Sequence, residues 1–200
     1  MRIIGGEVKG RKIETLDRPH LRPMLDRVRE NLFNIIQLDL PGADVLDLFS
    51  GCGSIGIEAL SRGASGCTFV ESDSELVKLI ERNLIKCGLG NRGDVLREDV
   101  LRLPARSRGR FRAQANIVFA DPPYALVNDE ARRRRLFAVF DDLVGELIVP
   151  GARLVLHHEP MDDVDWPTRS WRCCDRRVYG NSQLSFFDAG GEGHESGPNH

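Results

Sequence analysis

An acid, two prolines and an aromatic residue directly follow an apolar run at residues 117–120: Asp121-Pro122-Pro123-Tyr124. A strand would bring this tetrapeptide to the carboxyl edge of a parallel sheet, where ligands bind. The prolines lack N–H donors and leave carbonyl oxygens free to accept. An amine on an aromatic ring is a poor nucleophile. Hydrogen bonds to the Asp121 carboxylate and the Pro122 carbonyl would free its lone pair while the base stacks on Tyr124. We predict that these four residues act on an exocyclic amine.

A glycine-rich turn follows an earlier apolar run at residues 45–49 and has the pattern G-x-G-x-x-G from Gly51 onward. This pattern alone suggests a dinucleotide site. Asp47, however, lies within the predicted strand, and Phe49 and Ser50 precede the first glycine. An acid at this point suits a cationic amine and would repel a pyrophosphate. S-adenosylmethionine carries such an amine and no phosphate, so we predict that Asp47, Phe49, Gly51 and Gly53 bind it.

Two more acids stand at the ends of later predicted strands. Glu71 lies 18 residues beyond Gly53, where a carboxylate accepts hydrogen bonds from both ribose hydroxyls. Asp99 is placed to meet the adenine amine, with Val100 or Leu101 beside the ring. A strand-end acid alone is ordinarily solvated, but together with the glycine turn these two favour S-adenosylmethionine. Methyl transfer from a sulfonium needs no strong base, so most of the rate would come from aligning the reacting atoms.

Apolar β-branched runs alternate with helical periodicity along most of the chain. This alternation predicts an α/β fold with a mostly parallel sheet covered on both faces. A C-terminal pair of strands around residues 179–182 predicts a closing antiparallel hairpin. The predicted strands are 45–49, 67–71, 94–97, 117–120, 153–157, 171–178 and 183–187, and the predicted helices are 25–40, 55–62, 74–87 and 129–147.

Three parts of the chain differ in character. Residues 1–24 are predicted to form a basic arm, with a short β-hairpin that turns at Gly10. Residues 25–188 hold the main α/β domain, which begins with a helix. Residues 189–200 are mostly small or polar and are predicted to be disordered.

The composition excludes several classes of protein. Two hundred residues with 41% hydrophobic content suffice for one buried core. No run of eighteen apolar residues is present, and the first residues lack the apolar part of a signal peptide, so we expect a cytoplasmic protein with no membrane partner. The five cysteines form no C-x-x-C pair, and we expect no metal site. We also expect a monomer.

Positive charge is concentrated locally although the net charge is −2. Residues 1–30 carry eight basic and five acidic side chains. Residues 102–112 contain five arginines and no acid, and Arg132–Arg135 is a run of four arginines. Such clusters form phosphate-binding faces in some proteins and merely solvated surfaces in others.

Several motifs outside the two candidate sites narrow the family. They are Arg2-Ile3-Ile4-Gly5-Gly6, Lys9-Gly10-Arg11-Lys12-Ile13, the segment Leu21 to Phe33, Ser61-Arg62-Gly63-Ala64, and Tyr179-Gly180 followed by Leu184-Ser185-Phe186-Phe187. With the glycine turn and the Asp-Pro-Pro-Tyr segment, they resemble the bacterial 16S ribosomal RNA guanine-N2 methyltransferase family of the RsmD type. The resemblance covers about residues 2–187. It implies a Rossmann-like class I methyltransferase fold and S-adenosylmethionine as cofactor.

The resemblance also implies a substrate, namely a flipped guanine of small-subunit ribosomal RNA or of its assembly intermediate. Arg11 and Lys12 of the arm would hold phosphates. Arg27 and Arg29 are assigned to the same role, although ion pairs within one helix are the alternative for them. In the family the segment at Arg22 lies near the cofactor, which makes this arginine a candidate cofactor ligand. This chain has Met24 where the family usually has threonine, so a hydroxyl contact is absent here.

Two other functions remain open from the sequence. A DNA adenine-N6 methyltransferase would use the same chemistry, but such enzymes usually carry a sizeable target-recognition insertion. A non-catalytic RNA-binding module of this fold would have little reason to retain both Asp121 and Tyr124. A protein glutamine methyltransferase would prefer asparagine at position 121, and Asp47 disfavours an NAD-dependent dehydrogenase.

Overall fold

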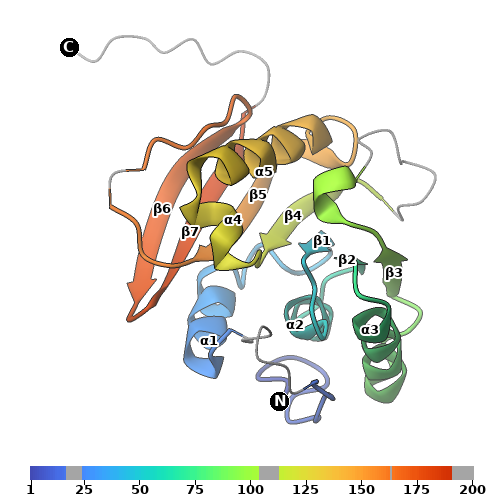
Figure 1. The fold of residues 1–200 in the computed structure, drawn as a ribbon. Coiled ribbons are helices and arrows are strands. Elements are labelled where there is room, and N and C mark those ends of the chain that lie inside the picture. Colours follow the sequence, from blue (N-terminus) through green and yellow to red (C-terminus); the bar gives the residue numbers. More distant parts are fainter. Residues whose placement is uncertain (17–23, 104–112, 163, 191–200) are drawn as a thin grey trace.

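One mixed sheet organises the computed structural model, which describes residues 1–16, 24–103, 113–162 and 164–190. The strand order is β3-β2-β1-β4-β5-β7-β6 (Figure 1). Strands β1 to β5 are parallel, and β7 is antiparallel to both β5 and β6. This confirms the predicted α/β fold. The strands are β1 (Asp44–Leu48), β2 (Gly66–Glu71), β3 (Gly93–Arg97), β4 (Ala115–Ala120), β5 (Ile148–His158), β6 (Trp171–Tyr179) and β7 (Ser182–Ala189).

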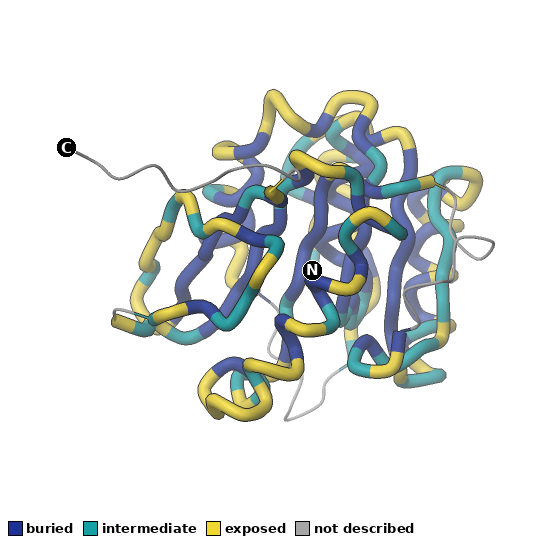
Figure 2. Tube along the Cα trace, turned by 90° about the horizontal axis from the view of Figure 1, so that it is seen from above, coloured by how far each residue is buried: buried dark blue, intermediate teal, exposed yellow. Residues whose placement is uncertain are grey.

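Helices cover both faces of the sheet (Figure 1). The N-terminal segment lies on one face with α1 (Asp26–Ile35), α2 (Ser54–Ser61) and α3 (Ser74–Cys87). The 3-10 helix η1 (Val100–Arg102), α4 (Tyr124–Asn128) and α5 (Glu130–Leu143) lie on the other. Each face has its own apolar core, one around Phe33, Phe69 and Phe119 and the other around Phe137 and Phe187. The central strands are therefore buried along almost their whole length (Figure 2).

Two predicted helices differ from the observed ones. The helix expected over residues 25–40 ends at Ile35, and Leu40 reaches the core from the turn that follows. The helix expected over residues 129–147 spans only Glu130–Leu143 and is preceded by the separate helix α4. Asp129 divides the two because its backbone is extended, while its carboxylate caps α5 by accepting a hydrogen bond from the Arg132 N–H.

The N-terminal segment pairs antiparallel as predicted, but over fewer residues than a regular two-stranded hairpin: the Ile3 N–H donates to the Arg11 carbonyl at 3.0 Å and the Ile13 N–H to the Met1 carbonyl at 3.1 Å. Arg2 and Lys12 form one isolated antiparallel bridge, with turns between them. Ile3 and Ile13 are almost fully buried in the same core as α1 and α2, so the segment packs against the main domain.

The C-terminal boundary also differs slightly from the prediction. Ala189, which the sequence assigns to the tail, is the last residue of β7. The prediction of disorder for the rest of the tail concerns mainly residues 191–200, which lie outside the described residues. In the part of the chain that the structure describes, no helix is long and apolar enough to cross a membrane.

Candidate active site

A cavity of about 560 Å³ opens at the carboxyl ends of β1, β2, β4 and β5. The chain leaves β1 toward α2 on one face of the sheet and β4 toward α4 and α5 on the other (Figure 1). Such a divergence between neighbouring parallel strands creates a crevice at their carboxyl ends. The volume suits a small-molecule cofactor. Eight predicted site residues line the cavity: Asp47, Phe49, Gly51, Glu71, Asp121, Pro122, Pro123 and Tyr124.

The turn after β1 is held in a strained, closely packed conformation. Phe49 has a φ of 60°, which is rare for a residue with a side chain. Gly53 has a φ of 79° and stands at the N-terminal cap of α2. A Cβ atom on Gly56 would lie 2.3 Å from the Phe69 ring, so glycine here permits close packing of α2 on β2. Gly51, with a φ of 57°, and Gly53 thus shape the turn, and Gly56 seats the helix that follows. Gly51 lines the cavity, whereas Gly53 does not.

Asp47 is a buried acid in the wall of the cavity. Its Oδ2 accepts a hydrogen bond from the Gly56 N–H at 3.0 Å. Burial nevertheless raises the pKa of Asp47 to about 8; the Gly56 hydrogen bond opposes this shift, and the nearby Asp121 and Glu71 carboxylates add to it. A cationic group in the cavity would favour the ionised form, so the site is electrostatically suited to an amine.

Glu71 closes β2 and braces the glycine turn. Its Oε2 accepts a hydrogen bond from the Gly51 N–H at 2.9 Å, and its Oε1 accepts one from the Asp73 N–H at 2.9 Å. Glu71 as a whole is 9% exposed and lines the cavity. These backbone donors fix its orientation at the strand end where the ribose ligand is predicted.

The Asp-Pro-Pro-Tyr segment begins where β4 ends. The Asp121 N–H extends the pairing with β1 by donating to the Leu48 carbonyl at 3.4 Å. Pro123 is the N-terminal cap of α4, and Tyr124 is its first residue. The acid and the aromatic ring therefore face the same cavity as Asp47 and Glu71, as the positions of their strands predicted.

His157 is a site residue that the sequence reasoning missed. It lies near the end of β5, and its Nδ1 is 2.7 Å from the Asp121 Oδ1. Its ring also contacts Tyr124 edge-on, with ring centroids 5.9 Å apart. The signal was present in the sequence, since β5 was predicted and parallel pairing with β4 would have brought its end beside Asp121.

One side of the cavity is formed by residues of the predicted basic arm, residues 1–24. Thr15, Leu16 and Met24 line it. Met24 is 5% exposed and presents an apolar surface to the cavity. Arg22 lies outside the described residues. Asp99 caps η1 by accepting a hydrogen bond from the Leu101 N–H, and its contact with adenine stays a prediction.

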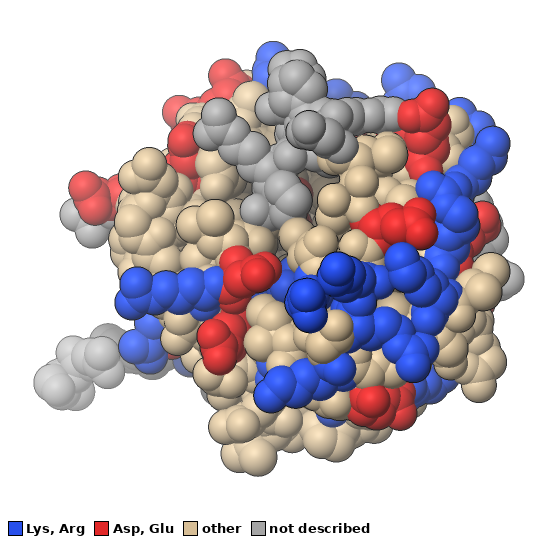
Figure 3. Space-filling view, turned by 90° about the horizontal axis from the view of Figure 1, so that it is seen from below, with Lys and Arg blue, Asp and Glu red and all other residues tan. Residues whose placement is uncertain are grey.

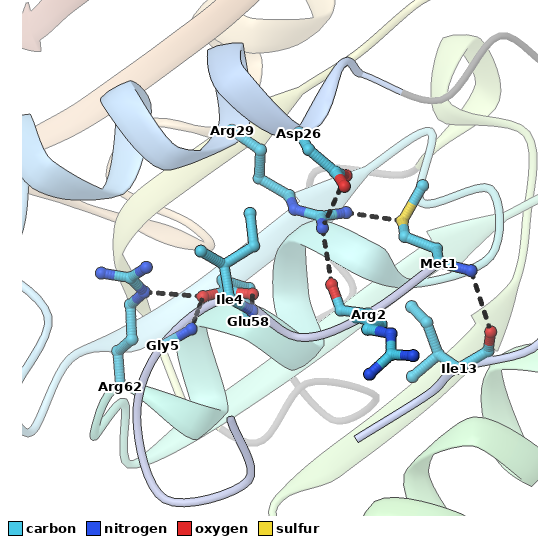
Figure 4. Close-up of polar contacts among 9 residues, drawn as sticks. All are labelled: Met1, Arg2, Ile4, Gly5, Ile13, Asp26, Arg29, Glu58 and Arg62. Atoms are coloured by element: carbon cyan, nitrogen blue, oxygen red, sulfur yellow. Dashed lines mark hydrogen bonds and ion pairs between the residues drawn. The ribbon is translucent and has the colours of Figure 1, made fainter. Parts of the chain in front are cut away.

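Two of the family motifs bind each other through a buried carboxylate (Figure 4). Glu58 on α2 is fully buried and accepts hydrogen bonds from the Ile4 and Gly5 N–H groups, both at 2.7 Å. It also pairs with Arg62 at 2.8 Å. The Ser61 hydroxyl donates to the Gly5 carbonyl at 2.6 Å. The Arg2–Gly6 motif and the Ser61–Ala64 motif thus form one clamp that holds the N-terminal segment on α2.

Arg29 must be removed from the predicted RNA-binding residues. Its side chain is fully buried, and its guanidinium donates to the Arg2 carbonyl at 2.7 Å and to Asp26 at 3.1 Å (Figure 4). It also contacts the Met1 sulfur. A buried guanidinium with these partners cannot reach a phosphate, so Arg29 anchors the N-terminal segment to α1.

The other three predicted RNA-binding residues, Arg11, Lys12 and Arg27, are exposed. Figure 3 shows lysine and arginine side chains gathered on the face that carries the N-terminal segment. Arg11 extends this surface toward α3, because its guanidinium donates to the Lys86 carbonyl at 2.9 Å. Arg132–Arg135 belong to α5 on the opposite face of the sheet, so they are not part of this surface (Figure 1). Most of the arginine-rich stretch 102–112 lies outside the described residues.

The parallel sheet, its reversed strand β7 and a cavity at the switch point define the class I methyltransferase fold. The chain belongs to the family described as Conserved hypothetical protein 95, whose profile matches residues 1–188. This confirms the family resemblance drawn from the motifs.

Three known proteins illustrate the relationship. Ribosomal RNA small subunit methyltransferase D of Escherichia coli strain K12 is 41% identical over 124 residues, which are 62% of this chain and 60% of that protein. The chain thus matches less than two thirds of this relative's length. The solved structure of yhhF from Escherichia coli has a TM-score of 0.79 at 28% identity and covers 95% of this chain and 98% of its own. An RNA methyltransferase from Salinibacter ruber, solved with S-adenosyl-L-homocysteine, shares the fold with a TM-score of 0.64 at 17% identity, covering 90% of this chain and 100% of its own.

Proposed function

We propose that this protein transfers a methyl group from S-adenosylmethionine to the exocyclic N2 of a guanine in small-subunit ribosomal RNA. The observation that carries the proposal is that one cavity contains both a buried acid suited to an amine, Asp47, and the Asp121–Tyr124 segment. The name of the Escherichia coli relative supports ribosomal RNA as the substrate. Action on such RNA also implies that the protein works in the cytoplasm.

The residues of the cavity fit S-adenosylmethionine. Asp47, whose pKa burial raises to about 8, would hold the amine of the methionine part. Glu71 would accept hydrogen bonds from the ribose, and Phe49, Ile55 and Met24 supply apolar wall. When bound, this cofactor supplies an electrophilic methyl group on a sulfonium. The protein's own task is to hold the target nitrogen in line with that group.

Asp121 and Tyr124 would hold the target base. Asp121 has one carboxylate oxygen bonded to His157, which leaves Oδ2 to accept a hydrogen bond from the amine. The Pro122 carbonyl would accept the second amine hydrogen. With both hydrogens engaged, the nitrogen becomes pyramidal and its lone pair points away from them. Tyr124, at the start of α4, provides the stacking face.

The Asp121 carboxylate does not by itself distinguish guanine from adenine. An ionised carboxylate offers only acceptors, and the guanine N2 and adenine N6 amines are both donors. The name of the Escherichia coli relative, a ribosomal RNA methyltransferase, is what favours RNA over the adenine-N6 alternative in DNA.

Methylation with radiolabelled S-adenosylmethionine, followed by nucleoside analysis, tests the proposal. The substrates are stripped small-subunit RNA, partly assembled small subunits, large-subunit RNA and DNA. We expect label in N2-methylguanosine of the small-subunit samples, and the first two substrates distinguish naked RNA from an assembly intermediate. Label in N6-methyladenine of DNA would establish the alternative. RNA binding without any transfer would identify a non-catalytic RNA-binding module.

A further inference from the structure

We propose that His157 is a positioning residue, which fixes the Asp121 carboxylate and the Tyr124 ring before the target amine arrives. This inference rests on the proposed function, because it assigns a role within the same reaction. It starts from a contact between two strands. Ala120, the last residue of β4, pairs with Leu156 of β5, so the next residue on each strand is Asp121 and His157 respectively.

The contact between these two side chains is short and largely shielded from water. The His157 Nδ1 lies 2.7 Å from the Asp121 Oδ1, and the histidine side chain is only 5% exposed, against 27% for the aspartate. A carboxylate accepts hydrogen bonds, so Nδ1 carries the hydrogen and donates. The donation occupies Oδ1 and sets the rotation of the carboxyl group. Oδ2 is then the oxygen left for the target amine.

The same imidazole ring limits the movement of Tyr124. The two rings meet at 71° with their centroids 5.9 Å apart, an edge-to-face arrangement. His157 therefore contacts both the hydrogen-bond acceptor and the stacking surface proposed for the base. A side chain that restrains both groups lowers the cost of arranging them when the substrate binds.

The other nitrogen of the ring shows that His157 is not simply tied into the fold. Its Nε2 is buried and has no hydrogen-bond partner among the residues that the structure describes. The neighbouring His158 differs: its Nδ1 meets the Glu159 carbonyl at 2.6 Å and its Nε2 meets the Ser185 hydroxyl at 2.8 Å. Successive side chains of a strand point to opposite faces. His158 thus supplies a matched control, a buried histidine on the same strand that does not line the cavity.

Single-turnover methylation of small-subunit RNA tests the role, with His157→Leu, His157→Asn and the control His158→Asn. We expect His157→Leu to slow transfer about 10- to 100-fold, because a small misplacement of the acceptor and the stacking ring spoils the alignment of the target amine. His157→Asn should keep a rate within about threefold of wild type, because its amide places an N–H near the position of Nδ1. His158→Asn should lower the melting temperature without slowing transfer. S-adenosylhomocysteine affinity should be unchanged in both His157 variants.

Combining His157→Leu with Asp121→Ala separates positioning from a general structural effect. If His157 acts mainly through Asp121, the leucine substitution costs about 10-fold or more in the wild-type background and severalfold less in the Asp121→Ala background, where only its contact with Tyr124 is left to lose. An equal loss in both backgrounds would overturn the proposal. So would a wild-type rate for His157→Leu.

Nitrogen-15 NMR of the histidine rings examines the pair without any RNA. Wild-type protein should show His157 with hydrogen on Nδ1, and Asp121→Ala should change that signal while leaving the His158 signal in place. A neutral His157 with hydrogen on Nε2 alone would refute the pairing. If the wild-type protein methylates no RNA, the proposed function fails, and this spectrum still decides whether His157 holds Asp121.

Discussion

Asn83 on α3 binds the backbone of Glu14 through both ends of its side-chain amide. Its Oδ1 accepts a hydrogen bond from the Glu14 N–H at 2.8 Å, and its Nδ2 donates to the Glu14 carbonyl at 3.0 Å. The same Nδ2 donates to the Cys52 carbonyl in the glycine turn at 3.1 Å. Because Thr15 and Leu16 line the cavity, Asn83 links the N-terminal segment to the candidate cofactor site.

Asn83→Ala should weaken both the fold and cofactor binding. The substitution removes three hydrogen bonds made by the fully buried Asn83 side chain, each worth about 0.5–1.5 kcal/mol. We expect a lower melting temperature and a severalfold higher Kd for S-adenosylhomocysteine, measured by calorimetry. Arg82→Ala is the control, since its ion pair with Glu14 is about half exposed and should contribute little. Unchanged ligand affinity in Asn83→Ala would show that the segment is independent of the site.

Asp47→Asn should stabilise the free protein at alkaline pH and weaken cofactor binding. The pKa of Asp47 is raised to about 8 by burial, above its ordinary value. The folded state therefore binds more protons than the unfolded state between about pH 4 and 8, and stability falls as pH rises through that window. Asparagine removes this penalty and still accepts from the Gly56 N–H. Melting curves at about pH 4.5 and 8.5 should show the difference growing with pH.

The same shift predicts the pH dependence of ligand binding. An amine binds the ionised form of Asp47, so binding releases a proton and the affinity for S-adenosylhomocysteine should rise from about pH 6 to 8. Asp47→Asn should bind more weakly and lose this dependence. Titrations in buffers of different ionisation enthalpy would detect the released proton. A pH-independent wild-type Kd would mean that no cation meets Asp47.

Glu71→Ala should weaken S-adenosylhomocysteine binding by about 1.5–3 kcal/mol, the scale of lost hydrogen bonds to a charged group. The structure adds a second cause, because Glu71 also orders the Gly51 and Asp73 backbone. Calorimetry with S-adenosylmethionine, its demethylated product and NAD measures the affinity for each ligand and identifies the class of cofactor that the protein binds. Wild-type protein should bind the first two and not NAD. NAD binding tighter than that of S-adenosylhomocysteine would contradict the cofactor assignment.

Replacing Arg11 and Lys12 by alanine should weaken RNA binding while leaving cofactor affinity unchanged. Both side chains are exposed on the basic face. Each lost phosphate contact lowers the slope of the logarithm of the binding constant against the logarithm of salt concentration by about one. Filter binding at several salt concentrations gives the slope. Deleting the whole segment is unsuitable, because Ile3 and Ile13 are core residues. Replacing both Arg132 and Arg135 by alanine, on the opposite face, is the matched charge control, and an equal effect there would show that the charges act nonspecifically.

The parts of the fold that depend on local pattern could be predicted from sequence. Strand β2 is buried throughout, so its apolar run identified it, and α3 was predicted with its observed bounds, Ser74–Cys87. The N-terminal segment could not be predicted in the same way. Its structure depends on Glu58 and Asn83, which lie far along the chain and contribute side-chain partners that no local pattern encodes.

The same distinction applies to the candidate site: residues marked by the local sequence could be predicted, and residues placed by contacts between distant segments could not. Asp47, Glu71 and Asp121 were found because each is an acid at the carboxyl end of a predicted strand. Arg29 was misassigned, because sequence shows its charge but not its burial. His157 was missed because its importance comes from a contact across β4 and β5.

Asp121→Ala tests the chemistry itself. If Asp121 accepts a hydrogen bond from the target amine, its loss should slow methyl transfer at least ~100-fold, equivalent to about 2.7 kcal/mol of barrier. S-adenosylhomocysteine affinity should change little in comparison, because the carboxylate faces the base. Asp121→Asn should retain part of the rate, since its amide oxygen still accepts. Single-turnover kinetics with saturating cofactor isolates the transfer step, and near-normal turnover by Asp121→Ala would reduce the segment to a structural turn.

Tyr124 provides the complementary test, because its ring and its hydroxyl have separable roles. Tyr124→Phe should keep most of the rate, since the ring face carries the stacking and the edge contact with His157 persists. Tyr124→Ala should lose base stacking worth about 1–3 kcal/mol. The loss should appear mainly in RNA affinity and in the transfer rate. If Tyr124→Phe were as inactive as Tyr124→Ala, the hydroxyl would be the functional group, and the stacking mechanism would have to be replaced by one in which that hydroxyl donates to the base.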